Sequence, residues 1–275
     1  MQITAILCIR NEEPYLEVTL AHLAACDIHL AIIDNESTDE TLQICRKFRR
    51  RIIYQSRLPY RGVFSLTDQL AAKAEVVRQV RSDWFIHQDA DEILESPQLA
   101  ESLRDGIERV SASGFNVINF NEFVFVPATA QDRFERRDFY DKMRHYYFFE
   151  PIPRRLMRAW QNRPGVVQLS GGHYVDGPDI RLCPENFILR HYPSLSLEHA
   201  RNKYPLRRFA PEDLAKGWHG NRLGVRADSV AFPAPNQLKA LRSAGDKNFD
   251  CGEPWQKHYW ENGGITNDVP GRRAA

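Results

Sequence analysis

Alternation of strand-like and helix-like segments predicts an α/β protein with a doubly wound, mostly parallel sheet. Over residues 3–113 the two patterns alternate four times, which is the order of a parallel sheet with right-handed crossovers. Two strand-like runs, 3–9 and 84–86, are almost wholly apolar, as in strands buried on both faces. Polar residues gather where these runs end, and ligands bind at such strand ends in open α/β sheets.

The first half of the chain is expected to hold four strand–helix pairs. The strands are predicted at 3–9, 29–34, 51–55 and 84–88, which are short runs rich in branched and aromatic residues. Between them apolar residues recur at helical spacing. The helix starts are predicted at Asn11 or Glu12, at Ser37 with Glu40 as a capping box, at Ser65 with Asp68, and at Ser96 before Pro97.

Beyond residue 114 the pattern is less regular. A long strand is predicted over 115–126, whereas 131–150 is compatible with either a helix or an ordered loop. Further strands are predicted at 166–174 and 187–191. The remaining expectations are a helix over 197–209 interrupted by Pro205, little regular structure after 233, and a loose tail over 263–275.

Composition narrows the class of protein. The chain has 275 residues, 43% of them hydrophobic and 27% charged, with a net charge of +1. These values are ordinary for a globular protein and give no sign of nucleic-acid binding. The five cysteines stand singly within apolar or helical segments, so we expect reduced core thiols in a cytoplasmic protein. The apolar residues 1–7 are too few for a signal peptide or a membrane span. The basic run 46–51 suits either a solvated face or a peripheral contact with the inner face of a membrane.

Polar residues follow three of the predicted strands. Arg10 and Asn11 follow the first strand, Asp34 ends the second, and Asp89 and Asp91 follow the fourth. Because the carboxyl ends of parallel strands lie on one edge of a sheet, we expect these residues to meet there. Neighbouring carboxylates repel each other unless a cation compensates, and Mg²⁺ or Mn²⁺ would do so while also binding a diphosphate. The other interpretation is that the acids only shape the turn that follows.

These segments resemble the nucleotide-sugar glycosyltransferases of the GT-A fold, specifically the family 2-like group. The resemblance covers residues 1–125 and lies mainly in 6–12, 33–41 and 89–92. It implies that Asp34 accepts a hydrogen bond from the nucleotide base. It also implies a base pocket lined by Ile9, Arg10 and Asn11, and binding of the ribose and of Mn²⁺ or Mg²⁺ by Asp89 and Asp91. Many members of the family carry an aromatic residue where Arg10 stands.

The later half is similar to a subgroup of the same family at 171–173, at 190–193 and at Lys203. In glycosyltransferases of this fold a late histidine sometimes completes the metal site. The resemblance therefore makes His191 the first candidate ligand, His173 the second and His219 the third, and each could instead be a hydrogen-bonded structural residue. Lys203 would bind phosphate, or would lie on an exposed helix face.

An inverting transferase needs a carboxylate base to take the proton of the acceptor hydroxyl. Asp176 is the predicted base, followed by Asp179 and then by Glu122. The segment 176–179 also has the composition of a turn, where aspartate is common. Without a base the enzyme would be a retaining transferase or catalytically inactive.

The predicted function is that of an inverting, metal-dependent glycosyltransferase, which moves a sugar from a UDP-linked donor to a glycan or glycolipid in surface polysaccharide synthesis. Residues 1–126 would form the nucleotide-sugar-binding half, 127–232 the acceptor-side half of the same domain, and 233–275 a C-terminal extension. Two alternatives stay open. A sugar-phosphate nucleotidyltransferase would normally show a Gly-rich phosphate loop after the first strand, and residues 10–13 are not one. The other alternative is a non-catalytic nucleotide- or glycan-binding module.

Overall fold

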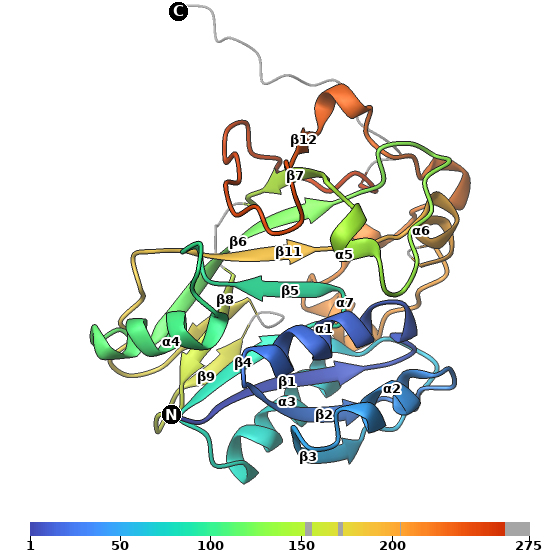
Figure 1. Cartoon of the computed structure of the whole chain (residues 1–275). Coiled ribbons are helices and arrows are strands. Elements are labelled where there is room, and N and C mark those ends of the chain that lie inside the picture. Colours follow the sequence, from blue (N-terminus) through green and yellow to red (C-terminus); the bar gives the residue numbers. More distant parts are fainter. Residues whose placement is uncertain (152–155, 170–172, 204, 262–275) are drawn as a thin grey trace, which may run out of the picture.

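The computed structural model describes residues 1–151, 156–169, 173–203 and 205–261. Within them most strands join one ten-stranded sheet with the main order β12-β7-β6-β8-β4-β1-β2-β3, to which β11 and β5 are attached through β6 (Figure 1). The strands of its first half are β1 (Ile3–Ile9), β2 (His29–Asp34), β3 (Ile52–Arg57), β4 (Trp84–Gln88), β5 (Glu92–Glu95) and β6 (Val117–Phe125). The later strands are β7 (His145–Phe149), β8 (Met157–Gln161), β9 (Val167–Leu169), β10 (Tyr174–Asp176), β11 (Phe187–His191) and β12 (Lys239–Ala240).

Strands β3, β2, β1 and β4 are parallel neighbours, as the apolar runs predict. In their register Ile9 lies opposite Asp34, and Leu7 lies opposite Gln88. The carboxyl ends of β1, β2 and β4 therefore lie on one edge of the sheet. The predicted α/β class with a doubly wound parallel sheet is confirmed for this half, and the site residues that follow these strands share that edge.

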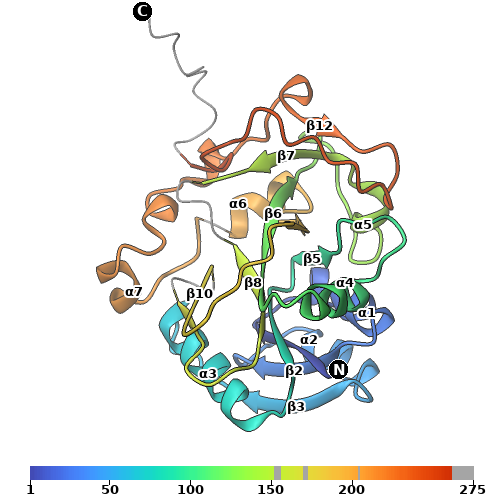
Figure 2. The same cartoon turned by 90° about the vertical axis from the view of Figure 1, so that its left-hand side faces the viewer.

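Helices cover both faces of the parallel strands. They are α1 (Glu13–Ala25), α2 (Thr41–Lys47), α3 (Leu66–Gln79), α4 (Leu103–Ala112), α5 (Phe139–Lys142), α6 (Leu197–Lys203) and α7 (Pro211–Ala215). One core cluster joins α1, α2 and α4 to the sheet, and a second joins α3 to its other face. Figure 2 shows α3 and α4 on opposite sides of the strands.

Two of the predicted helix starts are wrong. The helix placed at Ser96 begins at Leu103, capped by Ser102, whose Oγ accepts a hydrogen bond from the Asp105 N–H. Glu92–Glu95 forms an unpredicted strand, β5, which pairs antiparallel with β11, and after it the Ser96 hydroxyl accepts a hydrogen bond from the Gln98 N–H in a bend and turn over residues 97–100. The Ser37–Glu40 capping box is absent, because α2 starts at Thr41, whose N–H donates to Asp39 Oδ1 instead. The Ser65 cap on α3 is confirmed.

The second half adds antiparallel strands to the sheet. β8 lies between β4 and β6, and β7 pairs with the far edge of β6. The ambiguous segment 131–150 holds the short helix α5 and the strand β7, and the helix predicted over 197–209 ends at Lys203. The strand predicted over 166–174 is instead a hairpin of β9 and β10. Residues 171–172, which belong to the same predicted segment, and the predicted tail over 263–275 lie outside the described residues.

The C-terminal part packs through aromatic residues. Val124, Tyr147 and Trp260 lie in a third core cluster that joins the sheet to this segment. The segment also contains the short 3-10 helices η2 (Gly220–Arg222), η3 (Ala227–Ser229) and η4 (Pro235–Gln237). All five cysteines are free thiols, but Cys251 is exposed and is not a core residue as predicted. Within the described ranges, no helix has the length and apolar character needed to span a bilayer.

Candidate active site

The carboxyl ends of β1 and β2 form a compact polar corner. The Asn35 N–H donates to the carbonyl of Ile9, 2.8 Å away, which ties the two strand ends together. The Asp34 side chain is buried and its Oδ1 accepts a hydrogen bond of 3.1 Å from the Ser37 N–H. Ile9 is buried as well, so it can contribute to this corner mainly through its backbone.

Arg10 and Asn11 join this corner to the loop after β2. The Arg10 guanidinium stacks on Tyr60, with Cζ 3.4 Å from the ring centroid, and Nη1 donates to the Asn35 carbonyl at 2.7 Å. Asn11 has a positive φ of 53°, and its Oδ1 accepts a hydrogen bond from the Thr38 N–H. Tyr60 follows β3 and was not predicted as a site residue. Together Arg10 and Tyr60 form a flat cationic and aromatic surface beside Asp34.

Asp91 lies at the centre of a second group of charges. Its Oδ2 accepts a hydrogen bond of 2.8 Å from Lys203 Nζ and lies 3.6 Å from His191 Nε2. Burial disfavours the ionised carboxylate, but Lys203 and His191 outweigh it and hold the pKa of Asp91 well below its ordinary value. Lys203 also donates to the Pro193 carbonyl.

Strand pairing explains how His191 reaches Asp91. His191 is opposite Glu92 in the β5–β11 ladder, and the Tyr192 N–H donates to the Asp91 carbonyl. Burial alone would lower the pKa of His191, but hydrogen bonds and attraction from Asp91 and Glu122 raise it to about 10. The imidazole is therefore charged at neutral pH in this arrangement.

Asp89 faces a different set of side chains from Asp91. Its Oδ2 is 3.2 Å from Arg158 Nη2, and its Oδ1 is 3.4 Å from His87 Nε2 and 3.7 Å from Lys73 Nζ. Burial opposes ionisation of Asp89, but these neighbours, Arg158 foremost, keep its pKa well below the ordinary value. Arg158 is itself almost fully buried and pairs with Glu92.

Glu12, the residue before α1, lies close enough to Asp91 to be affected by its charge, and the sequence did not mark it as a candidate site residue. Burial and the nearby negative charge of Asp91 raise the pKa of Glu12 to about 8, although Lys203 and Arg207 act in the opposite direction. Its backbone N–H donates to the Thr41 hydroxyl. A carboxyl group that is largely protonated at neutral pH can donate a hydrogen bond, unlike the ionised Asp91.

Asp91 and His191 would fit a divalent cation if the imidazole lost its Nε2 proton and Lys203 moved away from Asp91. Their facing atoms, 3.6 Å apart, have a separation that two ligands of one ion at about 2.1 Å each can adopt. Among the described residues, no group of three or more acidic, histidine or cysteine side chains is arranged to hold a metal ion. Asp89, the other predicted ligand, is held by Arg158, Lys73 and His87 instead.

The other candidates come from separate elements. Asp176 is exposed on the β9–β10 hairpin, pairs in register with Val167, and accepts a hydrogen bond from the Gly177 N–H. His173 directly precedes β10 and is exposed, and its carbonyl accepts a hydrogen bond from the N–H of Met157, the neighbour of Arg158. His219 stacks on Phe209, with ring centroids 4.5 Å apart, and its Nε2 lies 3.7 Å from Asp213 Oδ2. These are the contacts of a histidine that stabilises the fold.

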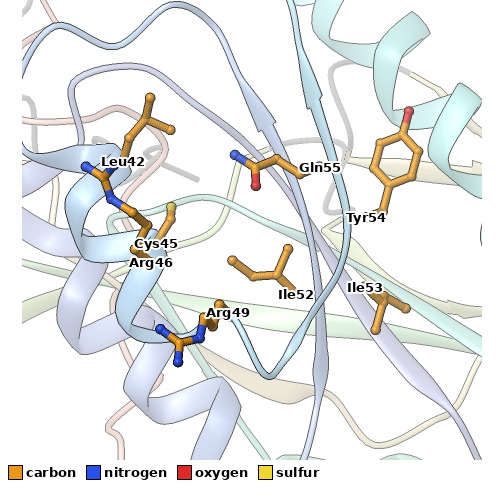
Figure 3. A pocket seen from close by; sticks show the side chains of 8 residues that line it. All are labelled: Leu42, Cys45, Arg46, Arg49, Ile52, Ile53, Tyr54 and Gln55. Atoms are coloured by element: carbon orange, nitrogen blue, oxygen red, sulfur yellow. The ribbon is translucent and has the colours of Figure 1, made fainter.

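A cavity of about 480 Å³ lies elsewhere, between α2 and β3 (Figure 3). Leu42 and Cys45 of α2 and Ile52 of β3 provide its apolar walls, and Arg46 and Arg49 add positive charge. It contains none of the predicted site residues.

Comparison with known proteins identifies the family. The family model described as glycosyl transferase family 2 matches residues 4–163, which is more than half of the chain. Uncharacterised glycosyltransferases of Rickettsia typhi and Rickettsia conorii are each 27% identical over 112 residues, covering 41% of this chain and 34% and 35% of theirs. The chain thus spans about a third of the length of these curated relatives.

Among solved structures, S. aureus TarS 1-349 is similar with a TM-score of 0.41 and 15% identity, over 73% of this chain and 64% of that one. Mannosyltransferase PcManGT from Pyrobaculum calidifontis, in complex with GDP-Man and Mn2+, has a TM-score of 0.34 and 17% identity over 43% and 35% of the two chains. On the evidence of the family match, this chain belongs to glycosyl transferase family 2.

Proposed function

We propose that this glycosyltransferase takes its sugar from a nucleotide-sugar donor, UDP-linked, and depends on Mn²⁺ or Mg²⁺. The observation that carries the proposal is the shared edge of the sheet, where Asp34 ends β2 and Asp91 follows β4. At the end of β2, the stacked Arg10 and Tyr60 and the buried Asp34 suit the base of a nucleotide. After β4, Asp91 with His191 and Lys203 suits a cation and a diphosphate.

Each part of the donor has a proposed partner. Asp34 would accept a hydrogen bond from the nucleotide base. Arg10 and Tyr60 would lie against the flat face of that base. The backbone of Ile9 and the side chain of Asn11 would line the rest of the pocket. Asp89 would bind the ribose. Lys203 would leave Asp91 and hold the phosphates, because its ammonium is a mobile point charge on a flexible stem.

The metal would be held by Asp91 and His191. When bound, a divalent cation supplies Lewis-acid stabilisation of the departing nucleoside diphosphate. The chain's own contributions are to orient the diphosphate through Lys203 and to keep Asp91 ionised. Glu12, protonated at neutral pH, would donate a hydrogen bond to an oxygen atom of the nucleotide sugar near Asp91.

Asp176 stays the predicted base for inversion, with an exposed carboxylate that a bound acceptor could reach. The acceptor is proposed to be a glycan or glycolipid in surface polysaccharide synthesis, used at the cytoplasmic side of a membrane. Peripheral contact with that membrane would use the basic run 46–51. Arg46, Arg49 and Arg50 are exposed there, whereas Lys47 and Arg51 already pair with Glu17 and Asp27.

Replacing Asp91 by asparagine tests the proposal directly. Asp91→Asn should reduce Mn²⁺-dependent hydrolysis of UDP-sugars by about a thousandfold, because the loss of charge stabilisation amounts to several kcal/mol. Asp228→Asn, which removes an exposed carboxylate 2.7 Å from Arg226, should leave hydrolysis unchanged. Full Mn²⁺-dependent activity of Asp91→Asn would remove Asp91 from the mechanism.

A further inference from the structure

Glu122 is an acid on β6 that the chemistry above does not use. Its Oε1 lies 2.6 Å from His191 Nδ1, and its side chain is only 11% exposed. β6 and β11 are parallel neighbours in which Glu122 is opposite Leu189, two residues before His191. Side chains two residues apart on a strand share a face, so the register itself brings the carboxylate and the imidazole together.

The second ring nitrogen of His191 points the other way. Nε2 lies 3.6 Å from Asp91 Oδ2, across the position proposed for the cation. A carboxylate that accepts a hydrogen bond from one ring nitrogen decides which nitrogen is left to bind a metal, and it fixes the plane of the ring. Glu122, His191 and Asp91 therefore form a continuous line from β6 through β11 to the turn after β4.

We propose that Glu122 is a positioning residue for the divalent cation. It holds His191 with the proton on Nδ1 and with Nε2 directed toward Asp91, so that the ring is ordered before the cation arrives. The proposal rests on the metal dependence proposed above. A role as the catalytic base is disfavoured because the carboxylate is engaged by His191 and mostly buried.

A purely structural role predicts a different outcome from a positioning role. If Glu122 only stabilises the β6–β11 pair, its removal lowers the melting temperature and leaves metal affinity intact. If it positions His191, its removal weakens metal binding, and it does so only while His191 is present.

The experiment measures Mn²⁺ binding by the full chain, without donor, from the electron paramagnetic resonance signal of free Mn²⁺. Glu122→Gln removes the charge with almost no change of shape and should weaken Mn²⁺ binding about 10- to 100-fold. His191→Ala should weaken it at least as much, and the double variant should show no further loss, because both changes break one unit. Glu185→Gln, which removes an acid paired with Arg109 instead, should bind Mn²⁺ like the wild type.

Two outcomes would overturn this inference and leave the proposed function untouched. One is wild-type Mn²⁺ affinity in Glu122→Gln. The other is a double variant whose loss of Mn²⁺ affinity equals the product of the two single losses. A wild type that binds UDP but no Mn²⁺ would instead refute the metal dependence in the proposed function, and the inference with it.

A second measurement needs no variant, in case Glu122→Gln does not fold. In wild-type protein with ¹⁵N-labelled histidine and bound Zn²⁺, the His191 ring should show the proton on Nδ1. A proton on Nε2 would contradict the proposal.

Discussion

At the residue scale, the main feature is competition for one carboxylate. Lys203 and His191 both face Asp91 Oδ2, at 2.8 Å and 3.6 Å. A divalent cation at Asp91 would have to displace the ammonium, which could then turn to the donor phosphates. Lys203 would thus couple the arrival of the cation to the arrival of the nucleotide.

Lys203→Met tests this coupling. Without the ammonium, Asp91 is open to a cation, so Mn²⁺ binding in the absence of nucleotide should become several-fold tighter while UDP binding becomes weaker. Both affinities can be measured by calorimetry. Lys216→Met, which removes an ammonium that bonds to the Thr67 hydroxyl, should change neither. Weaker Mn²⁺ binding by Lys203→Met would show that Lys203 supports the cation rather than competing with it.

Sequence reasoning named the acids of the candidate site but not all of their partners. Asp34, Asp91 and His191 could be named because strand ends and family motifs mark them. Tyr60 and Glu12 could not be assigned, because their roles depend on the tertiary positions of the loop after β3 and of the start of α1. Asp89 was named as a ligand beside Asp91, yet it lies among Arg158, Lys73 and His87, which come from separate elements.

At the element scale, the pairing of β5 with β11 organises the site. The Asp89–Asp91 turn joins β4, which lies in the parallel part of the sheet, to β5, which pairs antiparallel with β11. That pairing sets His191 opposite Glu92, beside Asp91. It also uses residues 92–95 as a strand, so the helix predicted from Ser96 starts later.

The strands buried at the centre could be predicted with their observed bounds: β1, β2, β4 and β11. Their apolar runs are bounded by polar residues, and burial on both faces leaves little freedom of register. β5 could not be predicted, because a four-residue segment with glutamate at both ends carries no pattern of its own. Tertiary pairing alone makes it a strand.

Ser102→Ala tests the corrected start of α4. The Ser102 hydroxyl accepts the Asp105 N–H at 3.1 Å, so its removal should lower the free energy of unfolding by about 1 kcal/mol, measured by urea denaturation. Ser111→Ala, inside the same helix, should change stability by at most a few tenths of a kcal/mol. Equal effects of the two substitutions would argue against the cap.

At the scale of the whole molecule, stability should depend on two histidines of opposite behaviour. Burial, aided by Lys73, lowers the pKa of His87 to about 4. The unfolded chain then binds the proton more tightly, so stability falls as pH drops from about 6.5 toward 4. The raised pKa of His191, about 10, gives the opposite sign: its contribution is complete below about pH 6.5 and is lost as pH rises toward 10.

The joint contribution of these two histidines to the free energy of unfolding should therefore be greatest near pH 6.5 and decline on both sides. His191→Asn should remove much of the decline between pH 6.5 and 10 and leave the acid side as it was, in urea unfolding measured across that range. An unchanged alkaline decline in His191→Asn would mean that other groups cause it.

The central claim is that the ends of β2 and β4 serve one nucleotide and one cation. A crystal structure of the wild type with UDP and Mn²⁺ tests it most directly. The account predicts the base beside Asp34 and Arg10, and an anomalous manganese peak that contacts both Asp91 and His191. A nucleotide bound elsewhere, for example in the cavity between α2 and β3, with no manganese at Asp91, would contradict it.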